Sequence, residues 1–301
     1  MTDAWKLRAE VPRDVATAAL VAQDEMADWP MEWVATASEI AEDRPDEWVF
    51  EVYLDRKPRR ADVSMVSSLF ATATPALKAE KLPDTDWVTQ SQKAVAPIVA
   101  GRFHVRTPDH PPSADRIDFV IPASQAFGTG QHATTAGCLA MLDLMRRRGV
   151  QVRNLADIGT GTGLLAMAGL ALWPHAFATA SDIDEVCAEV VAENLALNTM
   201  AQGGGRGELL MTIADGMADP LLQARGPYDL LIANILAAPL IALAPPFAAS
   251  VTGGGHLVLA GLLKTQEAVV RRAYFAQGFR LARRLVLGDW SILWLRRRAV
   301  R

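Results

Sequence analysis

The residues of this 301-residue chain that are best suited to chemistry lie in one glycine-rich stretch. Apolar residues before Asp157 predict a buried strand, and an apolar run from Leu164 predicts a helix. Between them, Gly159, Gly161 and Gly163 occupy alternate positions. Glycine lets the backbone turn sharply and lets a ligand approach without meeting a Cβ atom, and the helix start offers unpaired N–H groups. The stretch therefore predicts a turn that binds a nucleotide-type ligand.

Two classes of site fit this turn. From Gly161 to Ala166 it satisfies the dinucleotide fingerprint, which permits alanine at its last position. From Asp157 to Gly163 it resembles the first motif of class I S-adenosylmethionine-dependent methyltransferases. A glycine-rich turn that binds nothing is a third interpretation. The acidic strand end at Asp182 makes it less favourable, because a ribose-binding carboxylate is expected about twenty residues after such a turn.

Other polar residues stand at the ends of predicted strands or at a helix start. Asp182 ends the second strand, where its carboxylate can accept two hydrogen bonds from a ribose diol, whereas Asp184 can equally cap the next helix. Asp215 can contact an adenine amino group or serve as a turn residue. Asn234, at the exit of a central strand, can orient a reacting group or cap the following helix. Thr135, near the expected helix start, can place its hydroxyl beside a ligand or act as an N-cap.

The elements that must position these residues form two patterns. Strands and helices alternate from about 116 to 287, which predicts an α/β unit with a mostly parallel sheet. The resemblance of the glycine turn to the first motif of class I methyltransferases implies that this unit has their Rossmann-like fold. A closing hairpin, 279–287 and 291–297, has no crossover helix and implies one antiparallel strand. Before this unit, residues 5–71 follow a strand, helix, strand, strand, helix order, which predicts a small ferredoxin-like α+β domain. This domain has no catalytic cluster, so we expect it to be a recognition module.

The chain is expected to divide into three parts. Residues 1–95 form the α+β domain for substrate recognition, 96–115 a proline-rich linker, and 116–301 the domain that binds the cofactor. The linker holds four prolines with charged residues between them, which predicts limited freedom between two bodies. Residues 102–105 within it are a candidate short strand, and 86–94 a helical or irregular piece.

Composition excludes several classes of protein. A hydrophobic content of 50% and a charged content of 21% are typical of a globular protein, and a net charge of −4 argues against a general nucleic-acid binder. The cysteines, Cys138 and Cys187, fit a reduced cytosolic setting with both as core filler, and the five histidines show no metal-ligand spacing. The start of the chain lacks the apolar region of a signal peptide, and prolines interrupt the charge-free run 230–252. We therefore expect a cytoplasmic protein without a metal or a membrane span.

Four segments together carry a resemblance to a known family. Residues 127–135 (FGTGQHATT), 157–163, 182–184 and 233–236 (ANIL) are similar to PrmA, the bacterial methyltransferase family that acts on a ribosomal protein of the large-subunit stalk base. The glycine motif is common to many methyltransferases, whereas the first and last segments are much more specific. Ala133 departs from the family, which usually has proline there.

The resemblance implies a cofactor, a substrate and a set of site residues. The cofactor is S-adenosylmethionine with no metal, and the substrates are lysine side chains and the N-terminal amine of a large-subunit ribosomal protein. Thr135, Gly159, Asp182 and Asn234 match the family's cofactor contacts, and Gly161 matches the second glycine of its motif. Asn234 is also the expected catalytic residue, because its amide can orient a neutral amine. No direct contact with nucleic acid or membrane is expected, and the oligomeric state is left open, with a monomer as the default.

Three other functions remain as alternatives. The first is an NAD-dependent oxidoreductase. The second is a related class I methyltransferase that acts on another protein or a small molecule; the glutamine-directed branch carries Asn-Pro-Pro-Tyr where this chain has residues 234–237 (NILA). The third is a non-catalytic binding module, which the presence of Gly159, Asp182 and Asn234 together disfavours.

Overall fold

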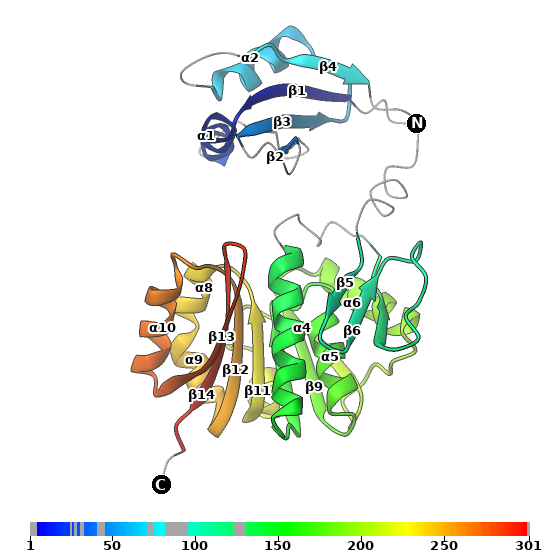
Figure 1. Cartoon of the computed structure of the whole chain (residues 1–301), viewed down its shortest axis with the longest axis vertical. Helices are drawn as coiled ribbons and strands as arrows, with labels where there is room; N and C mark the ends of the chain where they lie inside the picture. Colours follow the sequence, from blue (N-terminus) through cyan, green and yellow to red (C-terminus); the bar gives the residue numbers. More distant parts are fainter. Residues whose placement is uncertain are drawn as a thin grey trace. The chain divides into compact units, whose positions relative to one another are not determined.

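The computed structural model describes residues 5–24, 26, 29–30, 33–40, 46–70, 75–81, 96–122 and 131–299. The chain forms two compact units, Met1–Trp87 and Val88–Arg301, each described here by itself (Figure 1). The piece expected at 86–94 and the glycines of the FGTG segment lie outside the described residues. Among the described helices, none combines the length and the apolar character that a membrane crossing needs.

The first unit is a four-stranded sheet with two helices. Its elements are β1 (Trp5–Pro12), α1 (Arg13–Asp24), β2 (Val34–Glu39), β3 (Glu47–Leu54), α2 (Arg60–Ser68) and β4 (Lys78–Lys81). The strand order is β2-β3-β1-β4 with antiparallel pairs throughout. Alternate strand residues such as Leu7 and Phe50 pack with Ala16 and Val66 of the two helices in one apolar core. The first five elements agree with the predicted order, β4 is additional, and the ferredoxin-like assignment stays a prediction.

The second unit is built on a seven-stranded sheet of order β10-β9-β8-β11-β12-β14-β13. Neighbouring strands pair in parallel except at β14, which is antiparallel to β12 and β13, so the predicted single antiparallel strand is confirmed. The elements from β8 onward are β8 (Asn154–Ile158), α5 (Leu164–Leu172), β9 (Phe177–Asp182), α6 (Val186–Leu197), β10 (Leu209–Ile213), α7 (Pro220–Arg225), β11 (Tyr228–Asn234), α8 (Ala237–Ala242), α9 (Ala244–Ser250), β12 (Val251–Leu263), α10 (Glu267–Ala276), β13 (Phe279–Leu287) and β14 (Trp290–Arg297).

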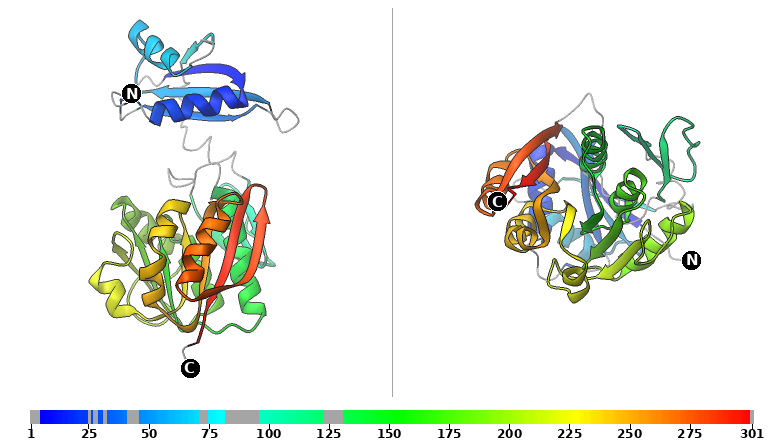
Figure 2. Two further views of the ribbon diagram at one scale, coloured as in Figure 1. Left: turned by 90° about the vertical axis from the view of Figure 1, so that its left-hand side faces the viewer. Right: turned by 90° about the horizontal axis from the view of Figure 1, so that it is seen from below.

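Helices cover both faces of this sheet (Figure 1, Figure 2). On one face, Leu155 and Leu230 pack with residues of α4 (Gln131–Arg147), α5 and α6. On the other, Ala156 and Leu231 pack with residues of α7 to α10. Because adjacent strand residues point to opposite faces and both faces are covered, the central strands are apolar throughout. The α/β class predicted from the alternating pattern and the Rossmann-like architecture implied by the resemblance are confirmed.

The segment expected to be a linker is folded differently. β5 (Ile98–Ala100), β6 (Phe103–Arg106) and β7 (Ile117–Val120) form a three-stranded sheet, whose apolar side packs in the same core as α4. The short strand expected at 102–105 is therefore present, but the boundary expected at 116 falls inside this sheet. The prolines of this segment did not reveal its strands, because they lie in the loops that flank the strands rather than within them.

Candidate active site

A cavity of about 620 Å³ lies at the carboxyl edge of the seven-stranded sheet. Its walls come from the loops after β8, β9, β10 and β11 and from the first part of α4. This size is within the range of cavities that hold a cofactor or drug-sized ligand. The cavity brings together every site residue that the sequence predicts: Thr135, Gly159, Gly161, Asp182 and Asn234. Parallel strands explain this, because they all end at the same edge of the sheet.

The glycine turn after β8 is shaped by backbone conformations that only glycine adopts easily. Gly159 has φ of 71°, and a Cβ atom there would lie 2.3 Å from Cγ2 of Ile235. Gly161 has φ of 56°, and a Cβ atom there would meet no atom of the described residues within 4 Å. Gly159 is therefore required for packing against the loop after β11, whereas Gly161 leaves open space on the cavity side where a ligand can approach the backbone.

Two neighbouring carboxylates have different tasks at the end of β9. Asp182 Oδ2 accepts a hydrogen bond from Gly161 N at 2.8 Å, and its Oδ1 accepts one from Asp184 N at 3.2 Å. Asp184 Oδ1 accepts from Val186 N at 3.0 Å, so this carboxylate binds the first turn of α6. Asp184 therefore bonds the first residue of α6 and also lines the cavity, although the cap position itself is Glu185, whose side chain makes no cap. The Asp182 carboxylate is held beside the glycine turn, and its remaining lone pairs can accept hydrogen bonds from hydroxyl groups.

Thr135 and Asn234 meet across the cavity although 99 residues separate them. Asn234 Nδ2 lies 3.5 Å from Thr135 Oγ1, at the outer limit of a hydrogen bond. α4 begins at Gln131, so Thr135 stands inside the helix, and its N-cap alternative is wrong. The cap position of α8 is Leu236, which makes no side-chain cap, so Asn234 does not start that helix either. Both side chains are therefore available to a ligand.

Asp157, near the end of β8, supports the glycine turn. Its carboxylate is buried, and its Oδ2 accepts hydrogen bonds from Thr160 Oγ1 at 2.7 Å and from Ala166 N at 3.1 Å. Its Oδ1 has no hydrogen-bond partner among the described residues. Burial raises the pKa of Asp157 to about 7. This side chain thus joins the glycine turn to the start of α5.

Sequence reasoning missed part of the cavity wall. Leu236, which is 71% exposed, and Trp290 at the start of β14 give an apolar side next to Asn234. Cys187 also lines the cavity and is not simple core filler, unlike Cys138, which is fully buried. Burial and the nearby carboxylates raise the pKa of Cys187 to about 11, so its thiol stays protonated near neutral pH. The described residues that line the cavity include no histidine or lysine.

Comparisons with known proteins agree on one family. The family model described as "Ribosomal protein L11 methyltransferase (PrmA)" matches residues 14–298. A ribosomal protein L11 methyltransferase of Agrobacterium fabrum is 38% identical over 269 residues, covering 88% of this chain and 89% of its own length. The corresponding protein of Mesorhizobium japonicum is 41% identical over 223 residues, covering 72% and 73%.

A solved structure of a protein with a corresponding name is also similar to this chain. The crystal structure of a ribosomal protein L11 methylase from Lactobacillus delbrueckii subsp. bulgaricus is 27% identical, with a TM-score of 0.57, and covers 68% of this chain and 100% of that one. The family match spans nearly the whole chain, and the fold and cavity agree with it. This chain therefore belongs to the PrmA family of class I methyltransferases, whose methyl donor is S-adenosylmethionine.

Proposed function

We propose that this chain transfers methyl groups from S-adenosylmethionine to amino groups of ribosomal protein L11, on lysine side chains and on the N-terminal amine. Membership of the family gives the substrate class. One observation of the structure supports this proposal most: a carboxylate, a glycine turn without side chains, a hydroxyl and an amide all line the same cavity.

The residues of the cavity fit this cofactor. Asp182 would hold the ribose hydroxyls, because its carboxylate is an acceptor that the backbone has already oriented. The open side of Gly161 would admit the ligand to the turn. Thr135 and Asn234, together with Gly159, would hold the part of the cofactor that carries the reacting methyl group.

The chain's contribution to the reaction is positioning and exclusion of water. When bound, S-adenosylmethionine supplies a methyl group that its sulfonium makes electrophilic. Asn234 Oδ1 can accept an N–H of the substrate amine and so orient the nitrogen lone pair. Leu236 and Trp290 would exclude water at that point, and a dry environment lowers the pKa of a lysine toward neutrality, which favours the uncharged nucleophile.

The first unit is proposed to recognise the substrate. Residues 1–87 hold 18 Asp and Glu against 10 Lys and Arg, so this unit is acidic, while the remaining residues carry an excess of basic groups. An acidic unit attracts a protein surface rich in lysines, which are the groups to be modified. We further propose that the enzyme works as a monomer in the cytoplasm, without direct contact with nucleic acid or membrane.

The test is methylation of purified L11. Full-length chain, L11 and S-adenosylmethionine are incubated, and mass spectrometry of the intact protein and its peptides locates the methyl groups. We expect methylated lysines and a methylated N-terminus, and much slower modification with an Asn234→Ala variant at equal concentration. If wild-type chain binds the cofactor but leaves L11 unmodified, a different methyl acceptor is the substrate.

The oxidoreductase alternative is tested with the same protein. A ligand that binds only the folded state raises the unfolding temperature, because it stabilises that state by an amount that grows with the logarithm of its concentration above the dissociation constant. We expect S-adenosylmethionine to raise the melting temperature and NAD to leave it unchanged. A shift with NAD alone would contradict the proposed function.

A further inference from the structure

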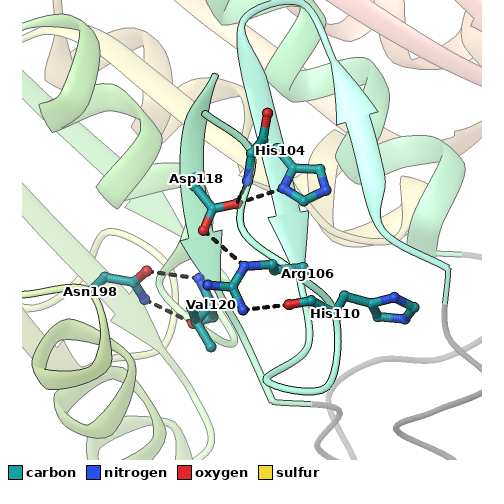
Figure 3. Close-up of polar contacts among 7 residues, drawn as sticks. His104, Arg106, His110, Asp118, Val120 and Asn198 are labelled. Carbon is teal, nitrogen blue, oxygen red and sulfur yellow. Dashed lines mark hydrogen bonds and ion pairs between the residues drawn. The ribbon is translucent and has the colours of Figure 1, made fainter. Parts of the chain in front are cut away.

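Helix α6 carries two asparagines one helical turn apart, and both bind the backbone of another element. Asn194, which is buried, donates from Nδ2 to the carbonyl oxygen of Thr162 at 2.9 Å. Asn198 is the C-cap residue of α6, and its side-chain amide exchanges two hydrogen bonds with the backbone of Val120, as a residue of a neighbouring strand would. Val120 N donates to Asn198 Oδ1 at 2.8 Å, and Asn198 Nδ2 donates to Val120 O at 2.8 Å (Figure 3). Neither asparagine lines the cavity.

These contacts join three segments that form or support the cavity. Thr162 lies in the glycine turn, between Gly161 and Gly163, and lines the cavity. The start of α6 follows Asp182 within four residues of chain. β7, which ends at Val120, packs in the same apolar core as α4, the helix that carries Thr135. α6 is therefore connected to the acid through the chain, to the turn through Asn194, and to the α4 side through Asn198.

The strand that Asn198 binds is itself firmly held (Figure 3). On β7, the carboxylate of Asp118 accepts from Arg106 Nε at 2.9 Å and from Ser113 N at 3.2 Å, and its Oδ1 lies 2.5 Å from His104 Nδ1. Burial alone would raise the pKa of Asp118, but the hydrogen bonds from His104 and Arg106 hold it below its usual value. Arg106 also donates to the carbonyl oxygen of His110 at 2.8 Å. α6 is thus attached to a rigid body rather than to a loose strand.

We infer that Asn194 and Asn198 are positioning residues of the S-adenosylmethionine site, an inference that rests on the proposed function of this cavity. The Asn194 amide fixes the peptide plane after Thr162, whose N–H, that of Gly163, donates to the carbonyl oxygen of Thr160 at 3.1 Å, and so it holds the turn in its closed form. Asn198 sets the place of α6 against β7, which keeps the turn and α4 at the separation that the ligand needs. A site arranged before binding costs less free energy to occupy, so loosening either contact weakens the cofactor's affinity.

The experiment compares two variants with a matched control. Asn194→Ala and Asn198→Ala remove the two contacts. Asn154→Ala removes an amide that likewise donates to two backbone carbonyls, of Arg225 at 2.6 Å and Pro227 at 3.1 Å, but at the opposite end of β8 from the cavity. Calorimetric titration with S-adenosylmethionine, well below each unfolding temperature, should show about 10- to 100-fold weaker binding for Asn194→Ala, and a smaller loss for Asn198→Ala. Asn154→Ala should lower the unfolding temperature while the dissociation constant stays at the wild-type value.

A second measurement needs no ligand. Amide hydrogen exchange in the cofactor-free protein should be faster over residues 158–166 in Asn194→Ala, with β12 unchanged, because only the turn has lost its support. Wild-type affinity in both asparagine variants, or wild-type exchange of the turn in Asn194→Ala, would overturn the inference. A wild-type chain that fails to bind S-adenosylmethionine would instead overturn the proposed function, so the two failures are distinct.

Discussion

Single side chains at the cavity differ in how firmly the protein holds them. Asp182 is fixed by backbone N–H groups of Gly161 and Asp184, so its carboxylate is oriented before any ligand arrives. Asn234 is held loosely, since Thr135 Oγ1 lies 3.5 Å from its amide. A fixed acceptor suits tight binding of hydroxyl groups, and a loosely held amide suits contact with a group that changes during a reaction.

Replacement of Asp182 tests the first of these roles. Asp182→Ala removes an acceptor of charge-assisted hydrogen bonds, so we expect S-adenosylmethionine to bind about 1–3 kcal/mol more weakly in calorimetry. Asp289→Ala, at an exposed carboxylate paired with Lys264, is the control and should bind as the wild type does. Unchanged affinity in Asp182→Ala would show that this residue does not hold the cofactor.

Replacement of Asn234 tests the second role. Asn234→Ala should reduce kcat by about 10²–10³, the scale for one polar group that orients a reacting centre. The unfolding temperature should change little, because the hydrogen bond that the Asn234 side chain makes within the described part of the chain is the long one to Thr135. Turnover of L11 is measured by mass spectrometry, and a variant with wild-type kcat would remove Asn234 from the mechanism.

At the scale of elements, side-chain contacts tie β8, the glycine turn and α5 together. Asp157 bonds the turn and the helix, and Ile235 packs from the next loop against Gly159. α6 adds support through Asn194. Substitutions within this β8–turn–α5 segment should therefore alter both stability and cofactor binding. Substitutions elsewhere on the sheet should alter stability alone.

Two glycine variants distinguish packing from backbone strain. Gly159→Ala and Gly149→Ala both place alanine in a left-handed conformation, which costs about 1–2 kcal/mol. Only Gly159→Ala adds an overlap, because its Cβ would lie 2.3 Å from Ile235, whereas the space at Gly149 is open. We expect urea unfolding to show an extra loss of about 1–3 kcal/mol for Gly159→Ala, together with loss of cofactor binding. Equal losses in the two variants would contradict the packing argument.

The buried carboxyl of Asp157 predicts a pH dependence of stability. Burial raises its pKa in the folded state to about 7, above an unfolded value near 3.8, so the folded form prefers the protonated acid. Its contribution to stability is fully present below about pH 4 and is lost as the pH rises through about 7. Relative to Asp157→Asn, the wild-type free energy of unfolding should therefore fall from pH 4 to pH 7 and level off above it. A difference that stays constant over this range would mean that Asp157 is ionised throughout.

At the scale of the whole molecule, the two units have separate apolar cores. The residues that pack around β1 and β3 are not shared with those that pack on the seven-stranded sheet. Each unit therefore has the means to fold independently. The cavity and all five predicted site residues belong to the second unit.

This separation predicts a division of function. Residues 88–301 alone should bind S-adenosylmethionine with near wild-type affinity, because the described residues that line the cavity all lie within them. The same fragment should methylate L11 much more slowly, because the acidic first unit no longer attracts the substrate. Calorimetry measures the affinity of the fragment for S-adenosylmethionine, and mass spectrometry measures its rate of L11 methylation. A wild-type rate of methylation by the fragment would show that the first unit does not recognise L11.

Local patterns in the sequence were enough for most of the second unit. Alternating strands and helices predicted the parallel sheet, and the carboxyl-edge rule placed the glycine turn, Asp182 and Asn234 together. The closing hairpin predicted the antiparallel strand, now seen as β14. These features depend on periodicity and chain order, which a sequence displays directly.

Other features depended on contacts between distant residues, and only the tertiary structure decided them. Thr135 reaches Asn234 across 99 residues, and Asn198 reaches Val120 across 78. Trp290 lines the cavity from the last strand, and 98–106 joins the second unit although the prolines on either side of it suggested a linker. The sequence by itself determined the class of fold, the family and the residues at the strand ends, because each follows from short-range pattern. Which carboxylate bonds the glycine turn and what supports that turn were set by packing, because hydrogen-bond partners are chosen by proximity in space rather than by order along the chain.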